Sequence, residues 1–276
     1  MRVGILTFEQ FQGRKNIGSS RIRGHWLLNH WPEAELFVQG QEYDAVIYQK
    51  AYFVEHAKVF KGIKIFDICD PDFLHWGYRT KEMIEEVDAV TTSTEALAES
   101  IRAFTDKPVY CVPDRVDLDV IPRRKEHKGR AEWVAWYGYS TNFPMLRPAV
   151  HALKQLKLNL AVISDSNFSL PAGSGDIQLR NLPHNWNTVY DDLLDMDIVI
   201  NPQSEKGRWQ YKSNNKTLLA WALGLPVAQN TEDLKRFMDA EERQKEAEMR
   251  LQEINDKWLV KYSVQEMKDI IASIKK

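Results

Sequence analysis

The stretch Asp197–Val227, DIVINPQSEKGRWQYKSNNKTLLAWALGLPV, decides the fold class of this chain. It opens with the apolar run Ile198–Ile200, which is typical of a buried strand. A polar loop with several cations follows, and Ser213-Asn-Asn then begins an apolar helix that ends at Gly224-Leu-Pro226. A strand that leads through a loop into a helix is typical of a parallel α/β sheet.

The start of this predicted helix favours an anion. The N–H groups of a first helical turn have no acceptor within the helix, and the helix dipole is positive at that end, so a phosphate satisfies both. Lys212 and Lys216 would supply further positive charge. Taken alone, the segment fits a solvated basic loop equally well.

Length and composition bound the possibilities. The chain has 276 residues, of which 43% are hydrophobic and 28% charged, so two folded domains are expected. A net charge of only −2 excludes a global field that would draw the chain to nucleic acid or an anionic membrane. Cys69 and Cys111 lie in or beside apolar runs, without the spacing of a zinc site or a disulfide framework, and they predict a cytoplasmic setting. No signal peptide is expected, and no apolar run reaches the roughly 18 residues of a membrane span.

Strands and helices alternate in both halves of the chain. In the first half, strands are predicted at Val3–Phe8, Leu36–Val38, Ala45–Tyr48, Ile63–Ile68, Ala89–Thr91 and Val109–Val112. Helices are predicted there at His25–His30 and Thr94–Phe104, the latter with a capping box of Thr92 and Glu95. In the second half, strands are predicted at Trp133–Tyr137, Leu160–Ile163, Ile177–Leu179 and Ile198–Ile200, and helices at Met145–Leu158, Thr188–Leu194, Thr231–Lys257 and Ser263–Ile274.

The pattern stops between Asp117 and Arg130, a polar, apolar-poor stretch that we interpret as a solvated linker. We therefore expect two Rossmann-like α/β domains that face each other across a cleft, residues 1–120 and 131–259. The last helix, residues 260–276, is expected to pack back on the first domain.

Two such domains could hold a dinucleotide, but the required signatures are absent from the sequence. The first loop has glycines only at Gly13 and Gly18, which is not the G-x-G-x-x-G that lets a backbone approach a pyrophosphate. The corresponding turn of the second half has Gly138 alone, and there is no P-loop motif. Hydride transfer and P-loop nucleotide hydrolysis are therefore not expected.

Several motifs occur in an order that resembles the GT-B glycosyltransferases. They are Gly18-Ser-Ser-Arg21, Asp88-Ala-Val-Thr-Thr-Ser-Thr94, Val112-Pro-Asp-Arg-Val-Asp117, Asp195-Met-Asp197-Ile-Val-Ile-Asn-Pro202, Ser204-Glu205-Lys-Gly207 and Gly224-Leu-Pro-Val227. The layout is similar to that of the retaining glycosyltransferase family 4 group. The resemblance spans nearly the whole chain and implies the transfer of a sugar from a nucleotide-diphosphate sugar, a UDP-sugar above all, with retention and with neither metal nor cofactor.

The sequence departs from that family at two places. The second of the two family glutamates is replaced by Leu219, so only Glu205 has a counterpart. The Arg and Lys that usually follow the first strand of the second domain are missing from Gly138–Phe143, and their role would fall to Arg208, Lys212 and Lys216. A nucleotide-sugar-binding module without turnover is the alternative function.

The resemblance implies a set of site residues. The catalytic residues would be Asp70, His75 and Glu205. Residues expected to bind the donor, with Leu182 and Trp186 against the nucleobase, are Gly138, Ser140, Asn142, Leu182, Trp186, Arg208, Lys212, Ser213, Asn214 and Lys216. Simpler interpretations stand beside these: His75 as a packing or surface histidine, and Asp70 and Asp72 as an Asx-turn.

The acceptor is expected at a basic loop near the N-terminus. Its predicted contacts are Arg14, Lys15, Ser19, Arg21, Arg23 and Asp72. Such a density of cations suits an acceptor that carries phosphates, such as DNA with a hydroxylated base. A glycan and a small molecule remain open, and Ser19 also fits an ordinary helix N-cap.

Overall fold

The computed structural model describes residues 1–202 and 207–274, except for the side chain of Trp76. These residues form two compact units. Unit 1 comprises residues 1–116, 207–213 and 259–274, and unit 2 comprises residues 117–202 and 214–258. The chain therefore passes from unit 2 into unit 1 for one short segment between two elements of unit 2.

Unit 1 is built on a six-stranded parallel sheet of order β2-β1-β3-β4-β5-β6. The strands are β1 (Val3–Leu6), β2 (Ala34–Leu36), β3 (Ala45–Gln49), β4 (Ile63–Ile68), β5 (Ala89–Thr92) and β6 (Val109–Cys111). Every residue of β1, β3 and β5 is buried, as expected for inner strands that are covered on both faces.

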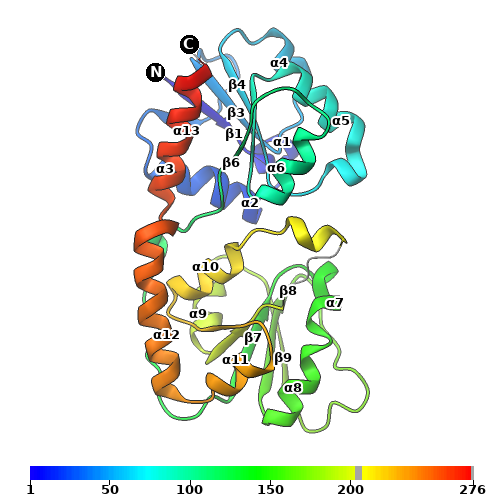
Figure 1. The fold of residues 1–276 in the computed structure, drawn as a ribbon, viewed down its shortest axis with the longest axis vertical. Helices are drawn as coiled ribbons and strands as arrows, with labels where there is room; N and C mark the ends of the chain where they lie inside the picture. Colours follow the sequence, from blue (N-terminus) through cyan, green and yellow to red (C-terminus); the bar gives the residue numbers. More distant parts are fainter. Residues whose placement is uncertain (203–206, 275–276) are drawn as a thin grey trace. The chain divides into compact units, whose positions relative to one another are not determined.

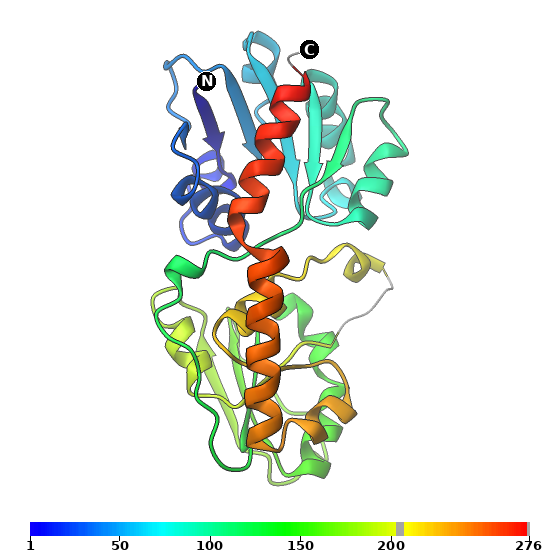
Figure 2. The ribbon, with the colours of Figure 1, turned by 60° about the vertical axis from the view of Figure 1, so that its left-hand side comes forward.

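Helices cover both faces of this sheet (Figure 1). They are α1 (Phe8–Gln12), α2 (Gly18–Ser20), the π-helical turn η1 (Arg21–His25), α3 (Trp26–Asn29), α4 (Val54–Val59), α5 (Phe73–Glu86), α6 (Glu95–Arg102) and α13 (Val260–Ile274). Side chains of α4, α5 and α6 share one apolar cluster with the sheet. Figure 2 shows α13, in red, running along the strands of unit 1, and it contacts α3.

Unit 2 has a five-stranded parallel sheet of order β11-β10-β7-β8-β9. The strands are β7 (Trp133–Tyr137), β8 (Asn159–Ser164), β9 (Leu179–Pro183), β10 (Ile198–Ile200) and β11 (Val227–Ala228). The helices are α7 (Phe143–Leu146), α8 (Ala149–Leu156), α9 (Val189–Leu194), α10 (Asn215–Ala222), α11 (Thr231–Arg236) and α12 (Ala240–Glu253), with short turns η2 (Leu118–Val120), η3 (Ser140–Asn142) and η5 (Ile254–Trp258).

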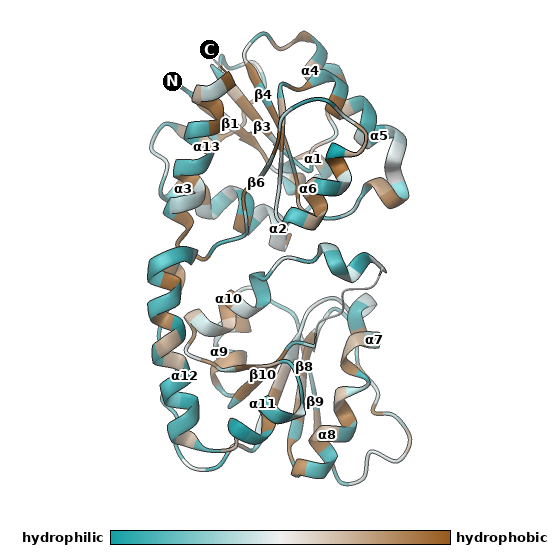
Figure 3. Ribbon diagram, viewed as in Figure 1, coloured by the Kyte–Doolittle hydropathy of each residue, from teal (hydrophilic) through white to brown (hydrophobic). Residues whose placement is uncertain are grey.

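Alternate residues of the unit 2 strands enter two apolar clusters. Trp136 and Val162 pack with α8 on one face, and Ala135 and Ile163 pack with α9 and α10 on the other. Figure 3 shows the resulting pattern, with apolar strands and a largely hydrophilic α12. The prediction of two parallel-sheet α/β domains is confirmed.

The segment predicted as a solvated linker packs along unit 2, so that interpretation is wrong. The Arg124 guanidinium donates to the carbonyls of Trp221, Ala222 and Ala247 at 2.8–3.2 Å. The Lys125 amide donates to Leu223 O at 2.7 Å. Few apolar side chains are needed, because this stretch is held by hydrogen bonds to backbone carbonyls at the end of α10 and along α12.

Three smaller expectations also need correction. Thr94, not Thr92, caps α6 by accepting from the amide of Leu97 at 3.3 Å, because Thr92 is the last residue of β5. The single helix predicted at Met145–Leu158 is divided into α7 and α8, with Pro148 at the N-cap of α8. The strand predicted at Ile177–Leu179 lies at Leu179–Pro183. Among the described residues, no helix is long and apolar enough to cross a membrane.

Candidate functional site

Charged side chains meet at the carboxyl ends of β3 and β4 in unit 1. Lys50 follows β3, and its ammonium lies 2.8 Å from Asp70 Oδ2 and 3.5 Å from Asp72 Oδ2. The Tyr52 hydroxyl donates to the same Asp72 oxygen at 2.9 Å. Ligands of open α/β folds bind at this edge of a sheet, so the cluster lies where chemistry is expected.

The Lys50 backbone is strained. Its φ of 51° lies in the left-handed region, which costs a non-glycine residue roughly 1–3 kcal/mol. The Lys50 side chain is only 9% exposed, and the Phe8 ring centroid lies 4.9 Å from its ammonium. Burial alone would lower the pKa of Lys50, but the negative charges around it outweigh burial and raise that pKa above its ordinary value.

The two carboxyl groups have different environments. Burial works to raise the pKa of Asp70, yet Lys50 and Lys212 lower it below the ordinary value. Burial and the nearby charge of Asp70 raise the pKa of Asp72, although Lys50 acts in the opposite direction. Asp70 is thus held ionised, whereas the neighbouring Asp72 accepts a proton more readily. Such a difference between two nearby carboxyl groups is typical of acid–base sites.

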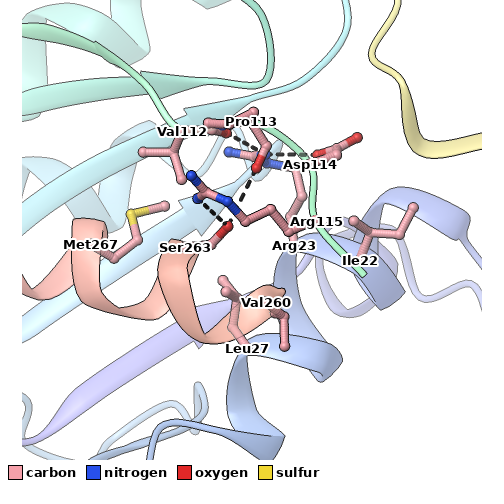
Figure 4. A pocket seen from close by; sticks show the side chains of 10 residues that line it. All are labelled: Ile22, Arg23, Leu27, Val112, Pro113, Asp114, Arg115, Val260, Ser263 and Met267. Atoms are coloured by element: carbon pink, nitrogen blue, oxygen red, sulfur yellow. Dashed lines mark hydrogen bonds and ion pairs between the residues drawn. The ribbon is translucent and has the colours of Figure 1, made fainter. Parts of the chain in front are cut away.

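Arg23 does not belong to an exposed basic rim, and the sequence prediction for it is wrong. Its guanidinium is buried between Asp67, at 2.6 and 2.8 Å, and Asp114, at 2.8 Å. It also donates to Val112 O at 2.9 Å, and Figure 4 shows it between Val112 and Asp114, whereas the guanidinium that donates to Ser263 of α13 is that of Arg115. All three charged groups are buried and paired, so Arg23 ties η1 to the sheet of unit 1.

The described part of the segment between β10 and α10, which includes the short helix η4 (Gly207–Tyr211), packs on unit 1. The Tyr211 ring lies edge-on to Phe73 with centroids 5.8 Å apart. Lys212 pairs with Asp70 Oδ1 at 2.8 Å, and the Ser213 hydroxyl donates to Asp114 at 2.6 Å. Arg208 stacks over Trp209 at 4.2 Å. Three predicted donor residues, Arg208, Lys212 and Ser213, thus belong to the same unit as Asp70.

In unit 2, Lys216 crosses the carboxyl end of β7. Its ammonium lies 4.8 Å from the Trp136 ring centroid. A Cβ added to Gly138 would lie 2.5 Å from Lys216 Nζ, and Gly138 has a φ of 146°, which side-chain-bearing residues rarely adopt. Gly138 therefore provides the space that lets the ammonium lie at this edge.

The loop after Gly138 is fixed by a carboxylate. Asp165, which follows β8, accepts from the Ser140 amide at 2.6 Å and from its hydroxyl at 3.1 Å. These hydrogen bonds hold the pKa of Asp165 below its ordinary value. Asn142 is half-buried at the end of η3, and Asn214 is the N-cap of α10 without a side-chain hydrogen bond to the first turn.

The predicted nucleobase residues lie at the edge of the unit 2 sheet. Leu182 belongs to β9, and both Leu182 and Trp186 are half-buried against the cluster that contains α9 and α10. The His184 ring meets Trp186 edge-on at 4.7 Å. An indole face and an aliphatic side chain at one strand end offer a stacking surface for a base.

The remaining predicted site residues are exposed, half-buried or outside the described part of the chain. Arg14 and Lys15 are exposed, whereas Ser19 and Arg21 are half-buried in α2 and η1. His75 is exposed in the first turn of α5. Glu205 lies outside the described residues.

Sequence reasoning missed Lys50, Tyr52 and Asp165. Lys50 and Asp165 directly follow the ends of β3 and β8, so their place after a predicted strand could have identified both. Tyr52 carries no comparable signal, because only the path of the chain after β3 brings its hydroxyl to Asp72.

No protein-family model and no curated protein sequence matches this chain, but solved structures do. The lipopolysaccharide outer core galactosyltransferase WaaB matches with a TM-score of 0.61 at 10% identity, covering 99% of each chain. The DNA-modifying enzyme beta-glucosyltransferase, solved with and without its substrate uridine diphosphoglucose, matches with a TM-score of 0.60 at 10% identity, covering 98% of this chain and 99% of its own. The chain spans 54% of a glycosylation-associated protein from Streptococcus agalactiae, with a TM-score of 0.48.

At such low identity the likeness shows the fold and nothing finer. The chain has the two parallel-sheet α/β domains of the GT-B glycosyltransferases.

Proposed function

We propose that this chain is a glycosyltransferase, which moves a sugar from a nucleotide-diphosphate sugar to an acceptor hydroxyl. The observation that carries the proposal is the position of Lys216. Its ammonium lies over Gly138 at the carboxyl end of β7, and Lys216 is the second residue of α10. A cation beside the positive end of a helix suits a diphosphate, and UDP is the nucleotide we favour.

Departure of the diphosphate builds negative charge on the leaving oxygens. Lys216 and the first turn of α10 would stabilise that charge from unit 2, with no metal and no cofactor in the proposal. Ser140, Asn142 and Asn214 would line the diphosphate, and Leu182 and Trp186 would hold the base. Further proposed contacts to the nucleotide-sugar are Arg208, Lys212, Ser213 and Glu205.

Asp70 is the proposed catalytic carboxylate of unit 1, with His75 near the acceptor. Lys50 and Lys212 each lie 2.8 Å from one oxygen of Asp70, which keeps this group ionised. Within the GT-B enzymes we propose the retaining family 4 group, on the strength of the motif order. NMR of the anomeric proton in the product tests retention.

The proposed acceptor is polyanionic, and DNA with a hydroxylated base is the form we favour. Arg14 and Lys15 are exposed in one loop of a nearly neutral chain, and Ser19, Arg21 and Asp72 complete the proposed contacts. The proposal of a DNA acceptor rests on these exposed cations, and a glycan or small-molecule acceptor is the alternative.

Calorimetry with UDP, GDP and ADP tests the donor site. Lys216→Ala should weaken UDP binding roughly 10- to 100-fold, because a charge-assisted contact contributes about 1.5–3 kcal/mol. Lys245→Ala, which removes an exposed lysine of α12, is the matched control and should bind like the wild type. Equal binding by all three proteins would remove this site. UDP-sugar binding without hydrolysis or transfer would favour the non-catalytic module.

A further inference from the structure

We propose that Lys50 is a positioning residue of the sugar-transfer site, whose ammonium fixes the carboxylates of Asp70 and Asp72 in place at the end of β4. The inference rests on the function proposed above and deepens it, since neither the motif pattern nor any structural likeness assigns a role to this residue.

The geometry requires a cation at this position. Asp70 and Asp72 are two carboxyl groups separated by one proline, and both lie within 3.5 Å of the same ammonium. The Asp72 side chain is only 14% exposed, so water screens it poorly. Without Lys50 the two negative charges would repel each other across a poorly hydrated site, and they would separate or take up a proton.

The strained backbone at Lys50 indicates that the Lys50 side chain has a functional role. A left-handed φ of 51° suits glycine, not a long side chain. The backbone nonetheless keeps this conformation, in which the Lys50 amide donates to Asp67 O at 2.8 Å. Strained backbone of this kind gathers at functional sites.

The two lysines on Asp70 differ in how tightly they are held. Lys212 is 48% exposed, so water or an incoming phosphate can replace Asp70 as its partner. Lys50 is 9% exposed and lies against Phe8, so water or a phosphate reaches its ammonium far less readily. Lys50 is therefore the permanent counter-charge, and Lys212 is the exchangeable one.

The effect of removing Lys50 on the titration of the carboxyl groups follows from this arrangement. Loss of the ammonium should raise the pKa of both Asp70 and Asp72, so less of the ionised form remains near neutral pH. The acid limb of the rate profile should then move to higher pH. The other charged or titratable groups that face the pair are Tyr52, Lys212 and Cys69, and Cys69 in turn faces Arg23 and Asp114.

The test compares Lys50→Met and Lys50→Arg with Lys58→Met, which removes an exposed lysine of α4. Lys50→Met should lower kcat on the order of 100-fold, as expected when a reacting group is misplaced, and should leave UDP binding unchanged. Lys50→Arg should restore part of the rate and of the pH profile. Lys50→Gln, whose amide still bonds to carboxylates, replaces Lys50→Met if thermal melting shows the latter to be unfolded.

Carboxyl ¹³C titration by NMR is the readout that does not depend on activity. The proposal predicts that Asp70 and Asp72 titrate at higher pH in Lys50→Met than in the wild type and Lys58→Met. Unchanged titrations together with an unchanged kcat would overturn it. A wild type that transfers no sugar would instead refute the proposed function, and the NMR titrations would still decide whether Lys50 holds the two carboxyl groups.

Discussion

Replacing Gly138 is the most local test of the proposed donor site. Gly138→Ala should destabilise the fold by roughly 1–3 kcal/mol, because alanine does not tolerate a φ of 146°. The new methyl group would also displace the Lys216 ammonium, so UDP affinity should fall about tenfold or more. Urea unfolding and calorimetry measure the two effects.

Gly77→Ala is the matched control for this change. A Cβ at Gly77 meets nothing within 4 Å, and the residue lies inside α5. Alanine there should leave UDP binding unchanged and stabilise the helix by about 0.5–1 kcal/mol. Wild-type UDP affinity in Gly138→Ala would show that the Lys216 position does not depend on this glycine.

His127 should make the fold sensitive to mild acid. The Arg243 Nε–H donates to His127 Nδ1 at 3.2 Å, so the neutral ring carries its proton on Nε2 and donates it to Gly224 O at 2.8 Å. Burial first, and the charge of Arg243 as well, lower the pKa of His127. The unfolded state therefore binds a proton near pH 6.5 that the folded state does not, and stability falls as the pH drops below about 7.

Urea unfolding between pH 8 and pH 5.5 measures this loss. His127→Gln keeps one acceptor and one donor without titrating, so its free energy of unfolding should depend less on pH than that of the wild type. His56, whose pKa is also lowered by burial, leaves a residual slope of the same sign. Identical slopes in the two proteins would contradict the assignment.

At the scale of elements, the loop between α1 and α2 is the proposed acceptor contact. Reversing Arg14 and Lys15 to glutamate should abolish binding of hydroxymethylated duplex DNA and leave UDP binding intact, because both side chains are exposed. Wild-type affinity for DNA should fall steeply with salt. A flat salt response with every polyanion would remove the nucleic-acid acceptor and favour a glycan or small molecule.

The apolar runs predicted the strands well. The bounds of β4, β7 and β10 agree with the prediction to the residue, because short, apolar runs flanked by polar residues leave little choice of register. The helix α5 was not predicted, since Gly77 and the buried Thr80 stand where an apolar helix face would continue from Phe73 to Met83. The attachment of residues 121–130 to unit 2 was not predicted either. It depends on hydrogen bonds to backbone carbonyls, and no residue type in the local sequence indicates such a partner.

The candidate site was predicted in part. Asp70 comes after the strand β4, and Lys216 lies in the first turn of α10. Both lie at the carboxyl end of a sheet, as expected. The burial of Arg23 could not be predicted, because its partners Asp67 and Asp114 are 44 and 91 residues away along the chain. The pairing of Lys212 with Asp70 spans 142 residues and depends on a segment that leaves unit 2 for unit 1.

At the scale of the whole molecule, the connection after η2 belongs to unit 2. Although residues 121–130 contain five arginines and lysines, limited trypsin digestion should leave them uncut, because Arg124 and His127 bind carbonyls of unit 2. A variant with Arg124→Ala and His127→Ala should be cut there. Rapid cleavage of the wild type in this segment, mapped by mass spectrometry, would instead support a free linker.

The central claim is that this GT-B fold transfers a sugar from a nucleotide-diphosphate sugar. Its most direct test is the release of nucleoside diphosphate from a panel of UDP-, GDP- and ADP-sugars, measured with hydroxymethylated DNA, glycans and water as acceptors. We expect the wild type and Lys58→Met to release UDP from a UDP-sugar, and Asp70→Asn to lose that activity. Absence of diphosphate release from every donor with every acceptor would contradict the account.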